Sequence, residues 1–301
     1  MSRKIISANL GMILVTMIWG ITFVMVKDAL NDAPPFIFLA LRKGLAFVAG
    51  VIYLNRNIKK ITTLEIIGGL VCALALYAGY SFQNFGLILT TPSKSAFITS
   101  VSVILVPVLL LLLGLQKVAL KIWLIIAVAL IGLYILLNPM GGEVNFGDIL
   151  TLGCALSFAI HIIFQDIYLK KKVDVVRFFV IQVMFVFLIS ALSGFAFESS
   201  NIILSERLFI AIVVTGILGT FVAIIIMLWA QTILSATQTA ILLSLEPVFA
   251  ALFSVFYAGE ILGLSGWIGG AIIVASVASS GFLASDSKNK NLKQEKLLAS
   301  K

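Results

Sequence analysis

The chain has 301 residues, of which 61% are hydrophobic and only 11% are charged. Soluble domains contain about 45–50% apolar and roughly 25% charged residues. This composition therefore excludes an ordinary soluble enzyme, a disordered protein and a nucleic-acid-binding protein. The formal net charge is +8, which on its own would suggest an acidic partner. The two cysteines, Cys72 and Cys154, lie in apolar runs and indicate no disulfide framework.

Runs with few or no charges predict the membrane spans, because a span needs about 20 consecutive apolar residues. The first run is too long for a signal-peptide core, so we expect it to be retained as a helix. The stretch 208–259 contains one charge, Glu246. As a single helix it would be roughly 78 Å long, more than twice the bilayer core, so it must fold back near 231–238. The ten predicted spans are 5–26, 34–54, 66–93, 95–116, 122–142, 149–165, 178–197, 208–230, 235–258 and 261–285.

The basic residues predict the orientation of these ten spans. Sixteen of the 21 Lys and Arg residues fall in the two tails and in the loops on the same side. The opposite loops hold three, Lys27, Lys94 and Arg207, and the last two lie within the second span. Cytoplasmic loops carry the excess of Lys and Arg, so we predict that both termini are cytoplasmic. The net charge then marks the cytoplasmic face, and 286–301 is predicted to be a disordered basic cytoplasmic tail.

Two pairs of segments share nearly the same offset, which indicates an internal duplication. The segment 100–108 resembles the segment 240–248, which places Pro107 and Pro247 in register 140 residues apart. At an offset of 139, Trp19-Gly20 corresponds to Phe158-Ala159. We predict one five-helix repeat at 1–140 and a second at 141–285. An odd number of spans forces the second repeat to be inverted, an arrangement typical of secondary transporters with a site near the midplane.

Short motifs occur at characteristic places along these spans: Trp19-Gly20, Arg42, the segment 90–99 leading to Pro107, Gly147-Asp148, Glu246-Pro247 and Gly259-Glu260. With them the sequence resembles the drug/metabolite transporter superfamily, in its ten-helix branch with two EamA-type halves. The resemblance covers almost the whole chain. It implies an all-α integral membrane fold of ten transmembrane helices, in a transporter of the bacterial cytoplasmic (inner) membrane. One departure is Gly114-Leu115-Gln116-Lys117, where first halves of the family often have Gly-Glu.

Ionisable residues at membrane depth are costly, so by default they face a cavity or a partner. Glu246 lies near the midplane and precedes Pro247, which frees the carbonyl of Leu243. This carboxylate could bind a proton, a cation or a cationic substrate, or it could form a structural bond to a neighbouring span. His161, the only histidine, could relay protons or contact substrate. Its alternative role is a hydrogen bond between helices.

Arg42 lies too deep in the second span to reach the outer surface easily. It could hold the carboxylate of an anionic or zwitterionic substrate, or bond structurally to helix ends or to Glu246. Lys43 points elsewhere on the same helix, and we assign it no role. Further residues could line a cavity, anchor the helices at the interface or bond between helices: Trp19, Thr22, Tyr80, Gln83, Phe97, Thr99 and Trp229.

The sequence contains no His-Glu-x-x-His motif and no phosphate-binding glycine loop, which argues against a metalloprotease or an ATP-driven pump. We expect no enzyme activity, no cofactor and no metal. We predict a secondary active transporter that moves a small organic metabolite or drug-like solute by alternating access, either coupled to protons or exchanging it for a counter-substrate. The lipid bilayer is its other partner, and the chain acts as a monomer or a homodimer. The alternatives are a membrane receptor or scaffold that binds a ligand without transport, and a passive channel.

Overall fold

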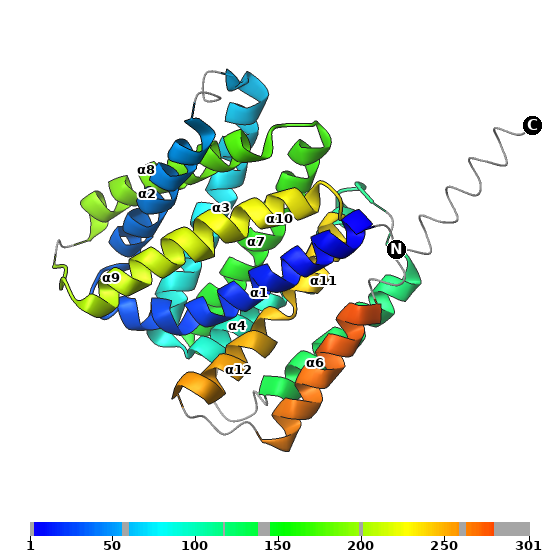
Figure 1. The fold of residues 1–301 in the computed structure, drawn as a ribbon. Coiled ribbons are helices and arrows are strands. Elements are labelled where there is room, and N and C mark those ends of the chain that lie inside the picture. Colours follow the sequence, from blue (N-terminus) through cyan, green and yellow to red (C-terminus); the bar gives the residue numbers. More distant parts are fainter. Residues whose placement is uncertain are drawn as a thin grey trace, which may run out of the picture.

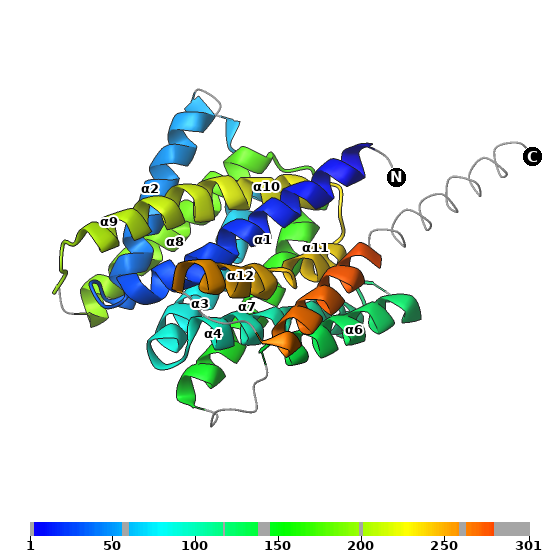
Figure 2. The same ribbon diagram turned by 60° about the horizontal axis from the view of Figure 1, so that its bottom comes forward.

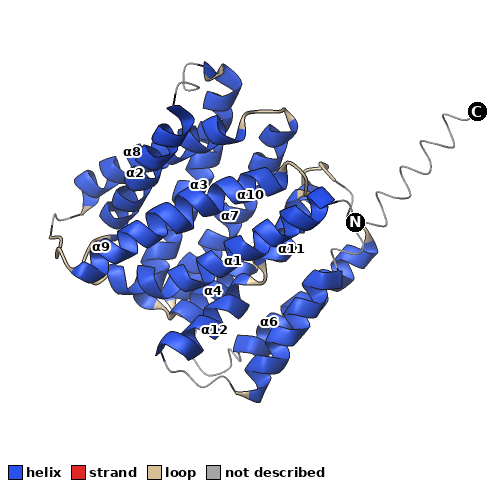
Figure 3. Ribbon diagram, in the orientation of Figure 1, coloured by secondary structure: helices blue, strands red, loops and turns tan. Residues whose placement is uncertain are grey.

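The computed structural model describes residues 3–55, 60–116, 118–137, 145–198, 201–258 and 263–279. Helices joined by short turns make up these residues, with no strand in the described part (Figure 3). Within these described residues, eight helices are long and apolar enough to cross a membrane, and two shorter apolar helices occupy the predicted fifth and tenth positions. All ten predicted segments are therefore helical. The predicted tail and Gly259-Glu260 lie outside the described residues.

The first half consists of α1 (Arg3–Ala29), α2 (Pro35–Leu54), α3 (Thr63–Leu89), α4 (Pro92–Ser100), α5 (Ser102–Leu112) and α6 (Leu120–Leu137). The second half consists of α7 (Phe146–Lys170), α8 (Val175–Phe197), α9 (Glu206–Val213), the π-helical segment η3 (Val214–Val222), α10 (Ala223–Gln231), α11 (Ala236–Leu243), α12 (Glu246–Ala258) and the helix Leu264–Ser279. Capping boxes at Thr62, Asn145 and Ser235 start α3, α7 and α11. Each supplies partners for N–H groups that the first helical turn leaves unpaired.

Three of the spans are not continuous α-helices. The fourth span breaks at Val101, between α4 and α5, and the ninth breaks at Ser244 and Leu245, between α11 and α12. Each break precedes a proline, Pro107 or Pro247, which cannot donate a backbone hydrogen bond to the residue four positions earlier. The eighth span instead widens into η3, a nine-residue π-helix.

Helix contacts between the two halves are reciprocal. The third span packs on the sixth, α3 on α7, while the eighth packs on the first through η3 and α10. Likewise α4 and α5 contact α7, while α11 and α12 contact α1, and α2 packs directly on α8. Figures 1 and 2 show α6 beside the helix Leu264–Ser279 at one edge, where Gly132 and Gly269 allow close approach. A duplicated five-helix unit accounts for this pattern.

Hydrophobic side chains both fill the interior and cover much of the exterior. Three buried apolar clusters hold the helices together. Large apolar side chains such as Ile52 and Phe195 are exposed, by 73% and 92%. Lipid accepts an apolar exterior but cannot hydrogen-bond polar groups. The buried polar residues therefore mark the places in the interior where apolar packing alone does not account for the residues present.

Ion pairs tie helix ends together at both ends of the bundle. Beyond the end of α1, Asp32 pairs with Arg207 at 2.6 Å and accepts a hydrogen bond from Ser205 at 2.6 Å. The Arg207 guanidinium and the Ser205 hydroxyl hold the pKa of Asp32 below its ordinary value of 3.8. At the opposite end, Glu65 pairs with Arg177 at 2.9 Å. Both pairs join the first half to the second.

Candidate functional site

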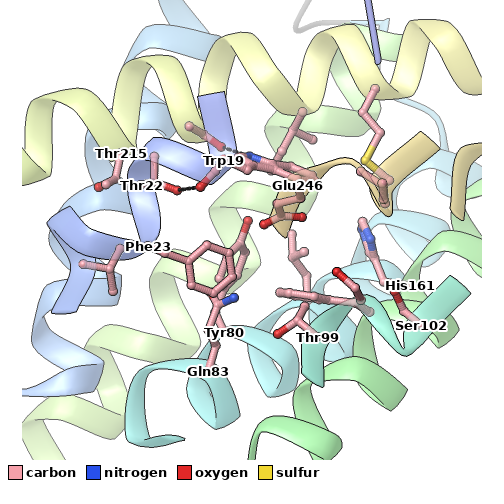
Figure 4. Close-up of a pocket in the computed structure, with 18 of the residues that line it drawn as sticks. Trp19, Thr22, Phe23, Tyr80, Gln83, Thr99, Ser102, His161, Thr215 and Glu246 are labelled. Carbon is pink, nitrogen blue, oxygen red and sulfur yellow. Dashed lines mark hydrogen bonds between the residues drawn. The ribbon is translucent and has the colours of Figure 1, made fainter. Parts of the chain in front are cut away.

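A cavity lies between the two halves, with lining residues from α1, α2, α3 and the broken fourth span on one side. The sixth, eighth and ninth spans supply the other side, and Figure 4 shows their side chains converging. Most of the lining is apolar or aromatic, with a few charged and hydroxyl groups. Eight of the ten residues predicted from the sequence line it: Trp19, Thr22, Arg42, Tyr80, Gln83, Thr99, His161 and Glu246.

Glu246 begins α12, directly after the break in the ninth span. Its carboxylate lies among the side chains of Trp19, Tyr80 and Thr99 in Figure 4. The residue is 9% exposed, and none of the ion pairs among the described residues includes it. The structural ion pair considered for Glu246 is therefore not formed in the described part of the chain, and the carboxylate is left facing the cavity.

Arg42 also lines the cavity without a carboxylate partner in the described residues. Its guanidinium carbon lies 4.3 Å from the centre of the Tyr80 ring and 5.8 Å from that of Phe38. The Nε atom is buried and has no hydrogen-bond partner. Arg42 thus lies against aromatic rings, and the ion pair with Glu246, one of the alternatives considered for it, is not formed among the described residues.

Lys43 contacts the same aromatic ring as Arg42. We assigned it no role because it points away from Arg42 on the helix, yet its Nζ lies 3.7 Å from the centre of the same Tyr80 ring. Its side chain is fully buried, and Nζ donates a hydrogen bond to Thr220 Oγ1 at 3.3 Å. The hydroxyl of Thr220 in turn donates to the carbonyl of Thr215 at 2.8 Å, which closes a turn of η3.

His161 is buried and lines the cavity, and its ring is held by a neighbouring helix. Its Nε2 lies 3.0 Å from the Oε1 atom of Gln182 on α8. The amide oxygen accepts, so Nε2 carries the proton in this arrangement. The hydrogen bond between helices that we considered as an alternative is present, and it leaves the cavity-facing position intact. One turn further along α7, Gln165 bonds to Gln231.

The repeat offset points to Phe158, a cavity residue that was not among the predicted site residues. Trp19 donates from Nε1 to the carbonyl of Gly219 at 2.8 Å, and Thr22 donates to the carbonyl of Trp19 at 2.8 Å. Their counterparts 139 residues later are Phe158 and His161, and all four residues line the cavity. Three hydroxyl residues on the lining were also missed, because nothing in their local sequence distinguishes them: Ser100, Ser102 and Thr215.

Two predicted residues do not line the cavity. Phe97 packs against the largest apolar cluster. Trp229 is 40% exposed and lies against Gly11 of the first span. Both positions have the same explanation, since an aromatic residue on an apolar helix packs against a neighbour or against lipid as readily as against a ligand.

The cavity combines a carboxylate, a guanidinium, an imidazole and hydroxyl groups with several aromatic rings. Such a lining can enclose a small organic molecule that has an apolar body and a charged group. Across the described ranges, no three His, Cys, Asp or Glu side chains are grouped as metal ligands.

Comparison with known proteins identifies similar chains. The EamA-like transporter family matches twice, at residues 6–138 and 145–282. An uncharacterized transporter of Archaeoglobus fulgidus is 33% identical over 275 residues, covering 91% of this chain and 85% of its own length. The uncharacterized transporter YoaV of Bacillus subtilis is 24% identical over 295 residues, 94% of this chain and 99% of its own. A crystal structure of another protein agrees in fold with a TM-score of 0.77 at 18% identity, covering 93% of this chain and 98% of its own.

Proposed function

The chain belongs to the EamA-like transporter family, and on this premise we propose that it is a secondary active transporter. It is a multi-pass membrane protein, and the names of its relatives indicate membrane transport rather than catalysis. We propose that it moves a small organic solute across the cytoplasmic membrane, with both termini on the cytoplasmic side. The observation that carries this proposal is the cavity between the two halves, which holds Glu246 without an ion-pair partner among the described residues.

The arrangement of helices around the cavity supports alternating access. Secondary transporters place their site between inverted repeats and use discontinuous helices there. In this chain the breaks at Val101 and at Ser244 lie beside cavity residues Ser100, Ser102 and Glu246. Movement of one half against the other would open the cavity first to one side of the membrane and then to the other.

Glu246 is our first candidate for coupling transport to a proton gradient, and His161 is the second. A carboxylate that faces a cavity at membrane depth and has no cationic partner can take up and release a proton with little rearrangement of its neighbours. His161 donates from Nε2 to Gln182, so a proton would be taken up at Nδ1 while the hydrogen bond between α7 and α8 is kept. Exchange for a counter-substrate is the alternative source of energy.

Proteoliposomes provide the test. A thermal-shift screen against a metabolite library first identifies a solute, and counterflow of that solute then measures transport. We expect solute-dependent proton movement, reported by a pH-sensitive dye inside the vesicles, to disappear in Glu246→Gln. The matched control is Glu206→Gln, an exposed glutamate at the start of α9, which should keep full coupling.

Two results would count against the proposal in different ways. Undiminished proton coupling in Glu246→Gln would reject the assignment to this carboxylate. Saturable binding without any counterflow would reject transport itself and favour a receptor or scaffold. Solute flux without saturation or counterflow would favour a passive channel.

A further inference from the structure

We propose that Lys43 is a second cation of this site and that, together with Arg42, it makes the cavity select solutes with a net negative charge. The class of ligand is a carboxylate with an apolar or aromatic body. This inference rests on the proposed function to the extent that the cavity is taken as the place where the solute binds. Beyond the proposed function, the inference specifies the charge of the solute and assigns a role to Lys43, which does not itself line the cavity.

One aromatic ring holds both cations. The Tyr80 ring has the Arg42 guanidinium carbon 4.3 Å from its centre and the Lys43 Nζ at 3.7 Å. Cations within about 6 Å of an aromatic centroid are attracted by its π face, and more so away from water. An ammonium has three N–H donors, and only Thr220 Oγ1 accepts from this one among the described residues. The ring therefore supports a charge that no carboxylate in the described chain compensates.

The charges that face this region do not balance. The ionisable side chains around it are Arg42, Lys43, His161 and Glu246. Arginine is always charged in proteins, and Glu246 supplies at most one negative charge. A protonated Lys43 on the Tyr80 ring would give the region a net positive charge whether or not Glu246 is ionised. With Glu246 ionised, a solute that carries one negative charge would restore neutrality, whereas a zwitterion would not.

The position of Arg42 gives that negative charge a contact. The guanidinium lines the cavity, and its Nε is buried without an acceptor. A carboxylate can accept from two guanidinium N–H groups at once. The rings of Trp19, Phe23 and Phe158 line the same cavity and suit an apolar or aromatic body. Lys43 contacts Tyr80 and does not line the cavity. Its charge would still attract a carboxylate in the cavity, because charges interact strongly over short distances when water is excluded.

Four probes that share a phenyl ring and differ in charge test the proposal. They are 3-phenylpropionate, its neutral amide 3-phenylpropionamide, the zwitterion phenylalanine and the cation 2-phenylethylamine. Binding to the full chain in lipid nanodiscs is measured by calorimetry at neutral pH. We expect the carboxylate to bind at least about tenfold more tightly than the amide, and more tightly than phenylalanine, with the amine weakest.

Variants then assign the selectivity to Lys43. Lys43→Met should lower the ratio of amide Kd to carboxylate Kd by about tenfold while leaving the amide Kd unchanged, a split that a purely structural role would not produce. Lys43→Arg should keep the ratio. Thr220→Val is the matched control, since it removes the oxygen partner of Lys43 and keeps the charge. If Lys43→Met does not yield a folded protein, Lys43→Gln replaces it, and the order of the four probes on the wild type is decisive in any case.

Several outcomes would overturn the inference. They are equal binding of the carboxylate and the amide, tighter binding of phenylalanine or of the amine, no binding of any probe, and an unchanged ratio in Lys43→Met. Counterflow of a neutral or cationic solute that 3-phenylpropionate does not inhibit would leave transport intact and reject the charge selectivity. Binding in the expected order without counterflow would reject transport and support the selectivity.

Discussion

The fourth and ninth spans occupy corresponding places in the two halves, yet they contribute different chemistry to the cavity. In the fourth span the break at Val101 comes six residues before Pro107, and the cavity receives hydroxyl groups from Ser100 and Ser102. In the ninth span the break comes directly before Glu246-Pro247, and the cavity receives a carboxylate. The duplication therefore preserved the position of a proline but not the residue beside it.

The two halves therefore share an arrangement of helices but contribute different side chains to the cavity. The residue 140 positions before Glu246 is Val106, which is fully buried in the largest apolar cluster. A carboxylate is accommodated at 246 because that position faces the cavity, and nothing comparable exists at 106. Four predictions test this comparison, from the largest expected effect to the smallest.

Placing the carboxylate at the corresponding position of the first half should have the largest effect. We expect Val106→Glu to destabilise the protein by about 2.5–3.5 kcal/mol, the cost of an acidic side chain at the centre of a membrane helix. The measurement is the yield of monodisperse protein on size exclusion together with its Tm. The control, Val106→Met, should be close to wild type, and a stable Val106→Glu protein would mean that the two positions are equivalent after all.

The packing of α1 on the ninth span should give the next largest effect. A Cβ atom on Gly20 would lie 2.8 Å from the backbone nitrogen of Ala250, so Gly20→Ala must push α1 away from α12. We expect a loss of about 1–3 kcal/mol, measured as a drop in Tm. Gly270→Ala serves as the control, because its Cβ would meet Val248 Cγ1 at 3.7 Å and Leu136 Cδ1 at 3.8 Å, both ordinary van der Waals contacts. The counterpart of Gly20 in the second half is already alanine, Ala159.

Removing a hydroxyl from the fourth span should affect the ligand more than the fold. Ser102 lines the cavity and makes no side-chain hydrogen bond to the described residues, whereas Ser100 donates to the carbonyl of Ala96 at 2.9 Å. We expect Ser102→Ala to weaken binding of the screened solute about fivefold, close to the loss of one hydrogen bond of about 1 kcal/mol, with Tm unchanged. A matched fall in Tm, or unaltered affinity, would contradict a role in binding.

The smallest effect concerns the connection between α1 and α9, and it depends on pH. The pKa of Asp32 is held below 3.8 by Arg207 and Ser205, so this pair stabilises the fold above the ordinary pKa. The contribution is lost as the pH falls through the lowered pKa of the folded state. We expect Asp32→Asn to have a lower Tm than wild type at pH 6, and the two Tm values to converge below about pH 3.8. A constant difference across that range would show that Asp32 acts by shape alone.

Much of the fold follows from the sequence because lipid imposes simple rules on it. Long apolar runs, the fold-back near Gln231 and the positions of the short fifth and tenth helices all agree with the structure. The break at Val101 was not predicted at that place, because Pro107 lies inside α5 rather than at its start. The π-helical segment also had no local signal, since the contacts that accompany it, such as Lys43 to Thr220, come from other helices.

The site was predictable where a residue type is rare at membrane depth, and much less so elsewhere. Glu246, His161 and Arg42 were identified because burying an ionisable group needs a reason. The contact of Lys43 with Tyr80 was not predicted, because helical spacing gives the direction of its Cα–Cβ bond but not the reach of its four-carbon stem. Trp229 does not line the cavity, since an aromatic ring on an apolar helix can also lie on the exposed surface.

The π-helical segment Val214–Val222 has a consequence for how this span can vary in length. Inserting or deleting one residue in an α-helix turns everything beyond it by about 100°, which would rotate one end of the span out of its contacts. A π turn already contains an additional residue in each hydrogen-bonded ring, so it can absorb such a change locally. We expect single-residue gaps between this span and those of its relatives to fall within these nine residues, while Ser205 and Gln231 keep their places at its two ends.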